Sequence, residues 1–95
     1  FALRPWFDAV VTREDYTRAK PDPDAFLTAA SRLGLPPHQC VVIEDAHKGV
    51  LAAHRAGIAV LAVPNEWTAG NDFSLAAAVL RHLDEVSVER VLRTL

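Results

Sequence analysis

The sequence has little that would direct it to a membrane, to nucleic acid or to an oxidising compartment. Its net charge at pH 7 is only −2, so no excess of basic residues favours nucleic acid or an anionic membrane surface. Apolar stretches such as residues 58–63 are far shorter than the ~20 residues that span a bilayer. The single cysteine, Cys40, has no partner for an internal disulfide, and no Cys/His cluster has zinc-site spacing. We therefore expect a cytoplasmic protein whose partner is neither nucleic acid nor a membrane.

Methionine is absent as well, even from position 1, where the chain begins with Phe1. An initiator methionine is normally removed only before a small residue, so we expect the sequence to be part of a longer protein. No internal repeat, low-complexity tract or linker divides its 95 residues. This length is enough for one modest hydrophobic core. We therefore treat residues 1–95 as a single unit, a domain or a portion of one.

Three short apolar segments have the pattern of buried parallel strands. They occupy residues 7–12 (FDAVVT), 40–43 (CVVI) and 59–63 (AVLAV). Each segment is rich in valine or isoleucine and is continuously apolar instead of alternating, which is typical of strands covered on both faces.

Helical patterns lie between these strands. Apolar residues at helical spacing predict one helix from about residue 23 to residue 33, which Gly34 would end. A second helix is expected from about residue 48 to residue 56, ended by Gly57. Strands and helices that alternate at these lengths predict an α/β fold with a doubly wound parallel sheet.

The last third of the chain supports two interpretations. Asp72 could cap a helix over about residues 73–83, whereas residues 77–80 could instead form a short edge strand. Periodicity alone does not separate the two. Ser87 is expected to cap a final helix that continues to the end of the sequence.

Two adjacent carboxylates, Glu44 and Asp45, follow the apolar segment at residues 40–43. In open α/β sheets, ligands bind beyond the carboxyl ends of the strands. Neighbouring acids repel each other unless a cation or a shared proton relieves them, and carboxylate oxygens suit Mg²⁺. The alternative is that Asp45 merely caps the next helix while Glu44 is solvated. The pair therefore indicates either a magnesium site or an ordinary helix start.

Lys20 begins the segment KPDPD at residues 20–24. A residue before proline avoids the helical region, so the backbone of this lysine is restricted to extended conformations. A lysine held in place near a phosphate can stabilise developing negative charge. The alternative is a solvated lysine before a well-capped helix. We assign Asp22 and Asp24 to the helix start and its dipole.

The order of these features resembles the haloacid dehalogenase (HAD) superfamily of hydrolases. The segment KPDPDAF, a helix ending in RLGL, and PPHQCVVIEDAHKGVLAAHRAGI are similar to the family's third and fourth motifs. The similarity covers essentially the whole chain and is closest to the branch of sugar phosphatases and β-phosphoglucomutase-like enzymes. It implies that residues 1–95 are the C-terminal portion of a HAD-like hydrolase core. Such a portion is part of a doubly wound, Rossmann-like parallel sheet that lacks its first two strands and its cap.

This resemblance implies a Mg²⁺-dependent phosphatase that works through an aspartyl-phosphate. Lys20 would steady the nucleophile and the transferring phosphoryl group, and Glu44 and Asp45 would hold Mg²⁺ directly or through water. The family's Asp-x-Asp nucleophile motif follows none of the apolar strands here. We therefore expect the chain alone to be inactive and to need the missing N-terminal half of the same domain. The expected substrate is a small phosphorylated metabolite such as a sugar phosphate.

Two other functions stay open. One is β-phosphoglucomutase-like phosphotransfer, because the cap that shapes substrate choice would lie outside this sequence. The other is a non-catalytic domain that binds a cation or a partner protein. A receiver-like phosphoacceptor domain is disfavoured, because its lysine should follow its acids, whereas Lys20 precedes Glu44 and Asp45.

The strand ends and the resemblance also predict where three of these features lie. Lys20, Glu44 and Asp45 should meet at the carboxyl edge of the sheet. The strand at residues 40–43 should pair in parallel with that at 59–63. The resemblance implies that the two missing strands lie between the strand at residues 7–12 and that at 40–43. These two strands should therefore stand about three strand spacings apart, or roughly 14 Å.

Overall fold

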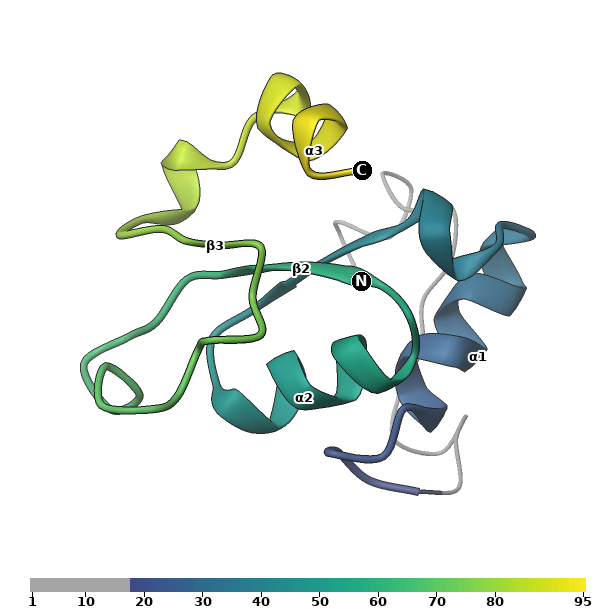
Figure 1. Cartoon of the computed structure of the whole chain (residues 1–95), viewed down its shortest axis with the longest axis horizontal. Helices are drawn as coiled ribbons and strands as arrows, with labels where there is room; N and C mark the ends of the chain where they lie inside the picture. The colour runs from purple at the N-terminus through teal and green to yellow at the C-terminus, as the bar shows by residue number, and fades with distance from the viewer. Residues whose placement is uncertain (1–17) are drawn as a thin grey trace, which may run out of the picture.

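A computed structural model describes residues 18–95 of the chain (Figure 1). The predicted strand at residues 7–12, and its distance from the rest of the sheet, lie outside these described residues.

The centre of the described part is a parallel sheet of three strands in the order β1-β2-β3. These strands are β1 (Val41–Glu44), β2 (Ala59–Ala62) and β3 (Ala78–Val79). β1 and β2 pair in parallel, as predicted, with Val41 opposite Ala59. Residues 60–62 of β2 are all buried, so both faces of this strand are covered. This burial on both faces explains why the sequence of β2 is apolar at every position instead of alternating with polar residues.

Three helices and two short 3₁₀ turns complete the described part. They are α1 (Asp24–Leu33), η3 (Pro37–Gln39), α2 (His47–Arg55), η4 (Leu83–Glu85) and α3 (Val88–Thr94). Gly34 has a φ of 71° just after α1, and Gly57 has a φ of 74° shortly after α2. These left-handed conformations suit glycine, which lacks a Cβ, and end each helix close to the predicted position.

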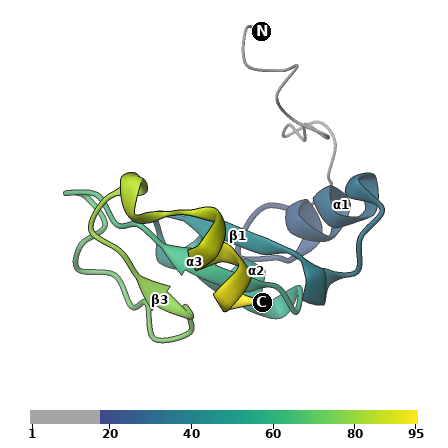
Figure 2. The ribbon, with the colours of Figure 1, turned by 90° about the horizontal axis from the view of Figure 1, so that it is seen from above.

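The helices cover both sides of the sheet. α2 packs against β1 and β2, and α1 packs against α2. α3 reaches β2 from the opposite side of the strands (Figures 1 and 2). The resulting core cluster consists of Val50, Ala53, Val60 and Ala62. Helices on both sides of a parallel sheet confirm the predicted doubly wound α/β class.

The last third of the chain resolves the choice between helix and strand. Residues 73–83 do not form a helix, because the backbone N–H groups of Ala77 and Leu80 donate to the carbonyl oxygens of Val60 and Ala62 in β2. The chain therefore adds β3 to the sheet, and the helical alternative is wrong.

The predicted cap at Ser87 is confirmed, since its Oγ accepts a hydrogen bond from the N–H of Arg90 at 3.1 Å.

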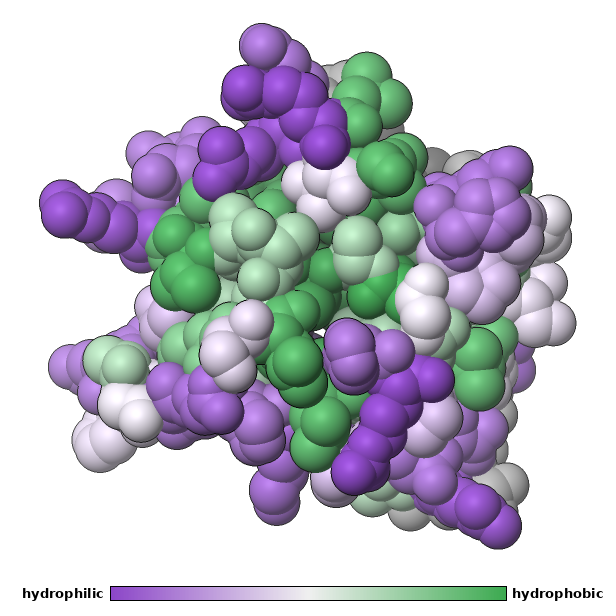
Figure 3. Space-filling model, in the orientation of Figure 1, coloured by the Kyte–Doolittle hydropathy of each residue, from purple (hydrophilic) through white to green (hydrophobic). Residues whose placement is uncertain are grey.

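Apolar surface gathers at the centre of one face of the molecule, ringed by polar residues (Figure 3). Ile43 of β1 is 45% exposed and Val79 of β3 is 54% exposed. Among the described residues, β1 has a neighbouring strand on one side only. The sheet in residues 18–95 thus has less cover over β1 than over β2.

No helix in this part of the chain is both long and apolar enough to cross a membrane.

Candidate functional site

Lys20 and Glu44 form an ion pair at the carboxyl end of β1. The Lys20 Nζ lies 3.1 Å from the Glu44 Oε2, and the two side chains are 36% and 11% exposed. The same ammonium group lies 5.0 Å from the centroid of the Phe26 ring, within cation–π range. The turn that carries the lysine is tied to the end of α2, because Arg55 donates to the Pro21 carbonyl at 3.3 Å. The lysine before α1 is therefore fixed against the strand end 24 residues later in the chain.

The neighbouring aspartates of the KPDPD segment support the helix start. The Asp22 Oδ1 accepts a hydrogen bond from the N–H of Asp24, the first residue of α1, at 3.0 Å. The Asp24 carboxylate accepts one from the N–H of Arg18 at 2.9 Å. These contacts agree with the assignment of both residues to the local turn and helix.

Glu44 and Asp45 differ in their surroundings. The Glu44 carboxylate is largely covered, and its Oε1 accepts a hydrogen bond from the Asp45 N–H at 3.2 Å. Asp45 is exposed, and its Oδ2 accepts from the Asn65 amide at 3.2 Å. The N-cap residue of α2 is Ala46, without a side-chain cap. The alternative in which Asp45 caps this helix is therefore wrong.

Asn65 places a carboxamide beside the acid pair just after β2. Its Oδ1 accepts hydrogen bonds from the N–H groups of Trp67 at 2.8 Å and Thr68 at 3.1 Å. Its own N–H donates to the Thr68 Oγ1 at 3.0 Å. The amide nitrogen that contacts Asp45 is thereby held in place by a tight turn. The sequence reasoning missed Asn65, although its position after an adjacent strand would have marked it under the same strand-end rule.

A second asparagine closes the same loop onto α2. The Asn71 Oδ1 accepts a hydrogen bond from the N–H of His47, the first residue of α2, at 2.9 Å. The His47 Nδ1 lies 2.8 Å from the Asp72 carbonyl oxygen. A hydrogen bond from the Ser74 backbone N–H lowers the pKa of the Asp72 carboxyl. Asn71 therefore acts as a cap supplied from a distant loop.

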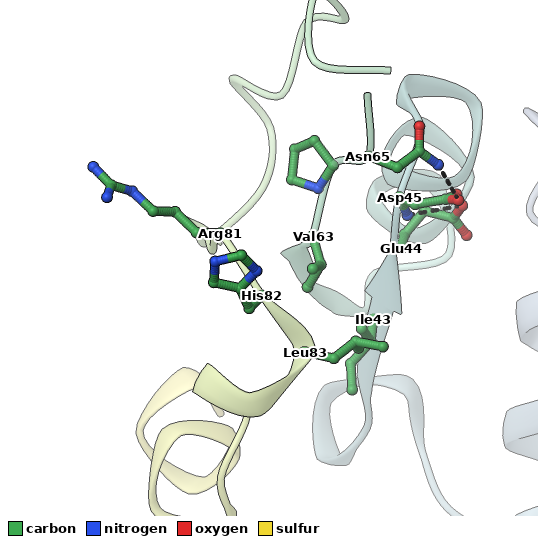
Figure 4. Close-up of a pocket in the computed structure, with 9 residues that line it drawn as sticks. Ile43, Glu44, Asp45, Val63, Asn65, Arg81, His82 and Leu83 are labelled. Atoms are coloured by element: carbon green, nitrogen blue, oxygen red, sulfur yellow. Dashed lines mark hydrogen bonds between the residues drawn. The ribbon is translucent and has the colours of Figure 1, made fainter. Parts of the chain in front are cut away.

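These strand ends border a cleft of about 470 Å³. Figure 4 shows the acid pair and Asn65 on one side of the cleft and Arg81 and His82 on the other, with Arg81 directed away from the acids. The lining residues are Ile43, Glu44, Asp45, Val63, Pro64, Asn65, Arg81, His82 and Leu83.

Glu85 shapes the turn that carries Arg81 and His82. Its Oε2 accepts hydrogen bonds from the N–H groups of His82 at 2.8 Å and Arg81 at 2.6 Å. These bonds, with the one from His82 contributing most, lower the pKa of the Glu85 carboxyl. A carboxylate that accepts two backbone N–H groups stabilises this turn in its charged form.

The acid pair has the chemistry of part of a magnesium site. Mg²⁺ prefers oxygen ligands and takes six in near-octahedral geometry, usually one or two carboxylates together with waters and phosphate oxygens. Within residues 18–95, no group of three or more His, Cys, Asp or Glu side chains is arranged to hold a metal. Asp45 and Glu44 therefore fit a site that needs further oxygens, from a phosphate, water or other residues.

Residues 1–63 match the family model described as haloacid dehalogenase-like hydrolase. The chain belongs to this family. Hexitol phosphatase A of Escherichia coli (strain K12) is 42% identical to it over 85 residues, which cover 87% of this chain and 38% of the relative. The chain spans about a third of the length of the first curated relatives it matches.

Solved HAD structures share the arrangement of strands and helices. CbbY from Rhodobacter sphaeroides in complex with phosphate is 31% identical, with a TM-score of 0.78, and the match covers 81% of this chain and 34% of that one. β-Phosphoglucomutase from Clostridium difficile is 26% identical, with a TM-score of 0.79 and coverage of 93% and 38%. The predicted resemblance to the sugar-phosphatase branch, and the α/β sheet that it implies, are confirmed.

Proposed function

We propose that this chain supplies the lysine and the metal-binding acids of a Mg²⁺-dependent phosphatase that acts on small phosphorylated metabolites. The observation that carries the proposal is the contact of Lys20 with Glu44, directly beside the exposed Asp45 at the carboxyl end of a parallel strand. Similarity to a hexitol phosphatase supports a sugar phosphate or a similar small ester as substrate. A cytoplasmic location stays part of the proposal.

Each residue has a distinct role in this proposal. Asp45 offers exposed oxygen to Mg²⁺, and Asn65 orients its carboxylate. Glu44 holds the Lys20 ammonium and completes the acid pair, either as a direct ligand or through water. Lys20 stabilises negative charge on the transferring phosphoryl group. Mg²⁺, when bound, would supply further charge stabilisation at the phosphate oxygens.

The nucleophile would be an aspartate outside this sequence. In the described residues, the only Asp-x-Asp spacing is that of Asp22 and Asp24, whose carboxylates accept backbone hydrogen bonds at the start of α1. The partner in the proposal is therefore the N-terminal half of the same domain. Attack by its aspartate on phosphorus would break the ester P–O bond and form an aspartyl-phosphate, while the departing sugar oxygen takes up a proton and leaves as the alcohol. Water would then hydrolyse the aspartyl-phosphate, which releases phosphate and restores the aspartate.

β-Phosphoglucomutase-like phosphotransfer is the second candidate. The structural likeness to a β-phosphoglucomutase favours it, and the same lysine and acids would serve either reaction. A non-catalytic domain that binds a cation or a partner protein is the third. It would need no nucleophile and would use the cleft beside Asp45 only for binding.

Phosphate release tests the proposal. The 95-residue chain with Mg²⁺ should not hydrolyse a hexitol phosphate above background. The same chain joined to the N-terminal part of hexitol phosphatase A should do so, and Lys20→Ala in this fusion should remove most of the activity. Conversion of one sugar phosphate to its isomer, without phosphate release, would favour the mutase. Robust turnover by the 95-residue chain, lost in a Glu44→Ala, Asp45→Ala double variant, would contradict the proposal.

A further inference from the structure

Gly49 lies in the first turns of α2, where its missing side chain leaves space that another residue uses. The glycine is buried. A Cβ built on it would overlap the Cδ, Cγ and Oε2 atoms of Glu44. Only Gly34 and Gly57 have positive φ among the glycines of the described residues, so ordinary helical backbone at Gly49 would accept any L residue. Space, and not backbone conformation, is the reason for glycine here.

Glycine is also unfavourable for the helix itself. Inside a helix it loses more conformational entropy on folding than alanine does. The segment from residue 46 to residue 56 otherwise contains several alanines that suit a helix. By contrast, a Cβ on Gly70 would meet no atom within 4 Å. The Glu44 side chain therefore occupies the space beside Gly49, whereas the space beside Gly70 is open.

The atoms that fill this space are the functional end of Glu44. Its side chain lies across the backbone of α2, where it is only 11% exposed. From there, its Oε2 reaches the Lys20 Nζ at 3.1 Å and its Oε1 accepts from the Asp45 N–H at 3.2 Å. The end of a glutamate side chain can rotate more easily than a packed helix can shift. A methyl group at position 49 would therefore displace the carboxylate and break both contacts.

We propose that Gly49 is a positioning residue for the Lys20–Glu44 ion pair. It leaves the pocket on α2 that holds the Glu44 carboxylate between the lysine and Asp45. The geometric part of this inference stands on the structure alone. Its consequence for catalysis rests on the proposed function, since the lysine and the acids would then act on phosphate and Mg²⁺.

Unfolding of the 95-residue chain in urea tests the geometric part. Gly49→Ala should lower the unfolding midpoint when Glu44 is present. In a Glu44→Ala background, the same change should raise the midpoint, because alanine is the better helix former and meets none of the three glutamate atoms. Gly70→Ala is the matched control and should behave alike in both backgrounds. If Gly49→Ala fails to fold, the Glu44→Ala, Gly49→Ala double variant should still fold. A loss of stability at position 49 in both backgrounds would overturn the proposal.

A spectroscopic reading separates positioning from a purely structural role. NMR on the labelled chain should show a scalar coupling across the hydrogen bond between the Lys20 Nζ and the Glu44 Cδ. The coupling should disappear in Gly49→Ala and persist in Gly70→Ala. A coupling that persists in Gly49→Ala, or that is absent from the unmodified chain, would overturn the proposal.

The catalytic consequence is measured in the fusion with the N-terminal part of hexitol phosphatase A. Gly49→Ala should lower kcat on the order of 10²-fold, as expected for a charged group misplaced by about 1 Å, with a smaller effect on KM. Loss of the coupling with unchanged kcat would leave Gly49 as the positioning residue and refute the catalytic role of Lys20. Loss of kcat with an intact coupling would refute the positioning role.

Discussion

The Lys20–Glu44 ion pair should couple the start of α1 to the end of β1 energetically. Lys20→Met keeps most of the apolar stem of the side chain but removes the ammonium group, and with it the cation–π contact with the Phe26 ring. Glu44→Gln keeps the shape of the carboxylate. A double-mutant cycle with these two changes isolates their interaction from the repulsion between Glu44 and Asp45. The cycle therefore measures how much the pair contributes to the free energy of unfolding.

The structure sets the expected magnitude. At 3.1 Å, two unit charges in water attract each other by about 1.3 kcal/mol. Exposed pairs contribute about 0.2–1 kcal/mol, while breaking a fully buried pair costs about 3–5 kcal/mol. With exposures of 36% and 11%, this pair lies between the two cases. We expect a coupling of about 1–2 kcal/mol. Lys20→Met should cost more than Glu44→Gln, because it leaves the more covered charge without its partner.

Urea unfolding monitored by circular dichroism measures the cycle, and the chain offers a matched control pair. Arg93 and Glu89 are 4.0 Å apart on α3, with side chains 66% and 81% exposed. Their coupling should stay below about 0.5 kcal/mol and should disappear in 1 M salt, where the screening length falls to about 3 Å. In the same 1 M salt, part of the Lys20–Glu44 coupling should remain, because the Glu44 side chain is largely covered. A Lys20–Glu44 coupling no larger than that of the control pair would refute the reasoning.

Four further outcomes are expected. In the active fusion, Lys20→Ala should lower the rate of phosphate release by about 10²–10³-fold, since it removes charge stabilisation from the transition state. Asp45→Ala should raise the Mg²⁺ concentration that gives half-maximal rate, and Asn65→Ala should raise it less, because it only frees the carboxylate to turn. Because the pKa of Glu85 is lowered on folding, the contribution of this carboxylate to stability is full above pH 4.5 and is lost as the pH falls through the lowered value. The urea midpoint should therefore change less between pH 6 and pH 3 in Glu85→Gln than in the unmodified chain. Leu61→Ala should lower the unfolding free energy by about 2–5 kcal/mol, because this fully buried side chain would leave a cavity.

The sequence predicted those parts of the fold that depend on local chemistry. Valine-rich segments and helix-ending glycines lie where β1, β2, α1 and α2 begin or end, within a few residues. The segment around β3 was ambiguous because its conformation depends on hydrogen bonds from Ala77 and Leu80 to a strand 17 or 18 residues earlier. Such long-range pairing leaves no periodic signal in a short stretch of alanine, valine and leucine.

The candidate site shows the same division between local and distant chemistry. Glu44 and Asp45 could be identified because they follow a strand, and the contact with Lys20 was expected at the same edge. The roles of Asn65 and Gly49 depend on side chains that meet across loops or across a strand–helix turn. The resemblance to HAD hydrolases named no role for them, and only their geometry indicates one.

The cap that Asn71 supplies to α2 also gives the protein a built-in reporter of loop motion. The His47 amide is the first N–H of the helix, and its partner is the side chain of a residue 24 positions later. Helices leave their first N–H groups without partners inside the helix, so this amide is protected from solvent exchange only while the loop is closed. Its hydrogen-exchange rate, compared with that of the Val50 amide deeper in α2, therefore measures how often the Asn71 side chain leaves the start of the helix.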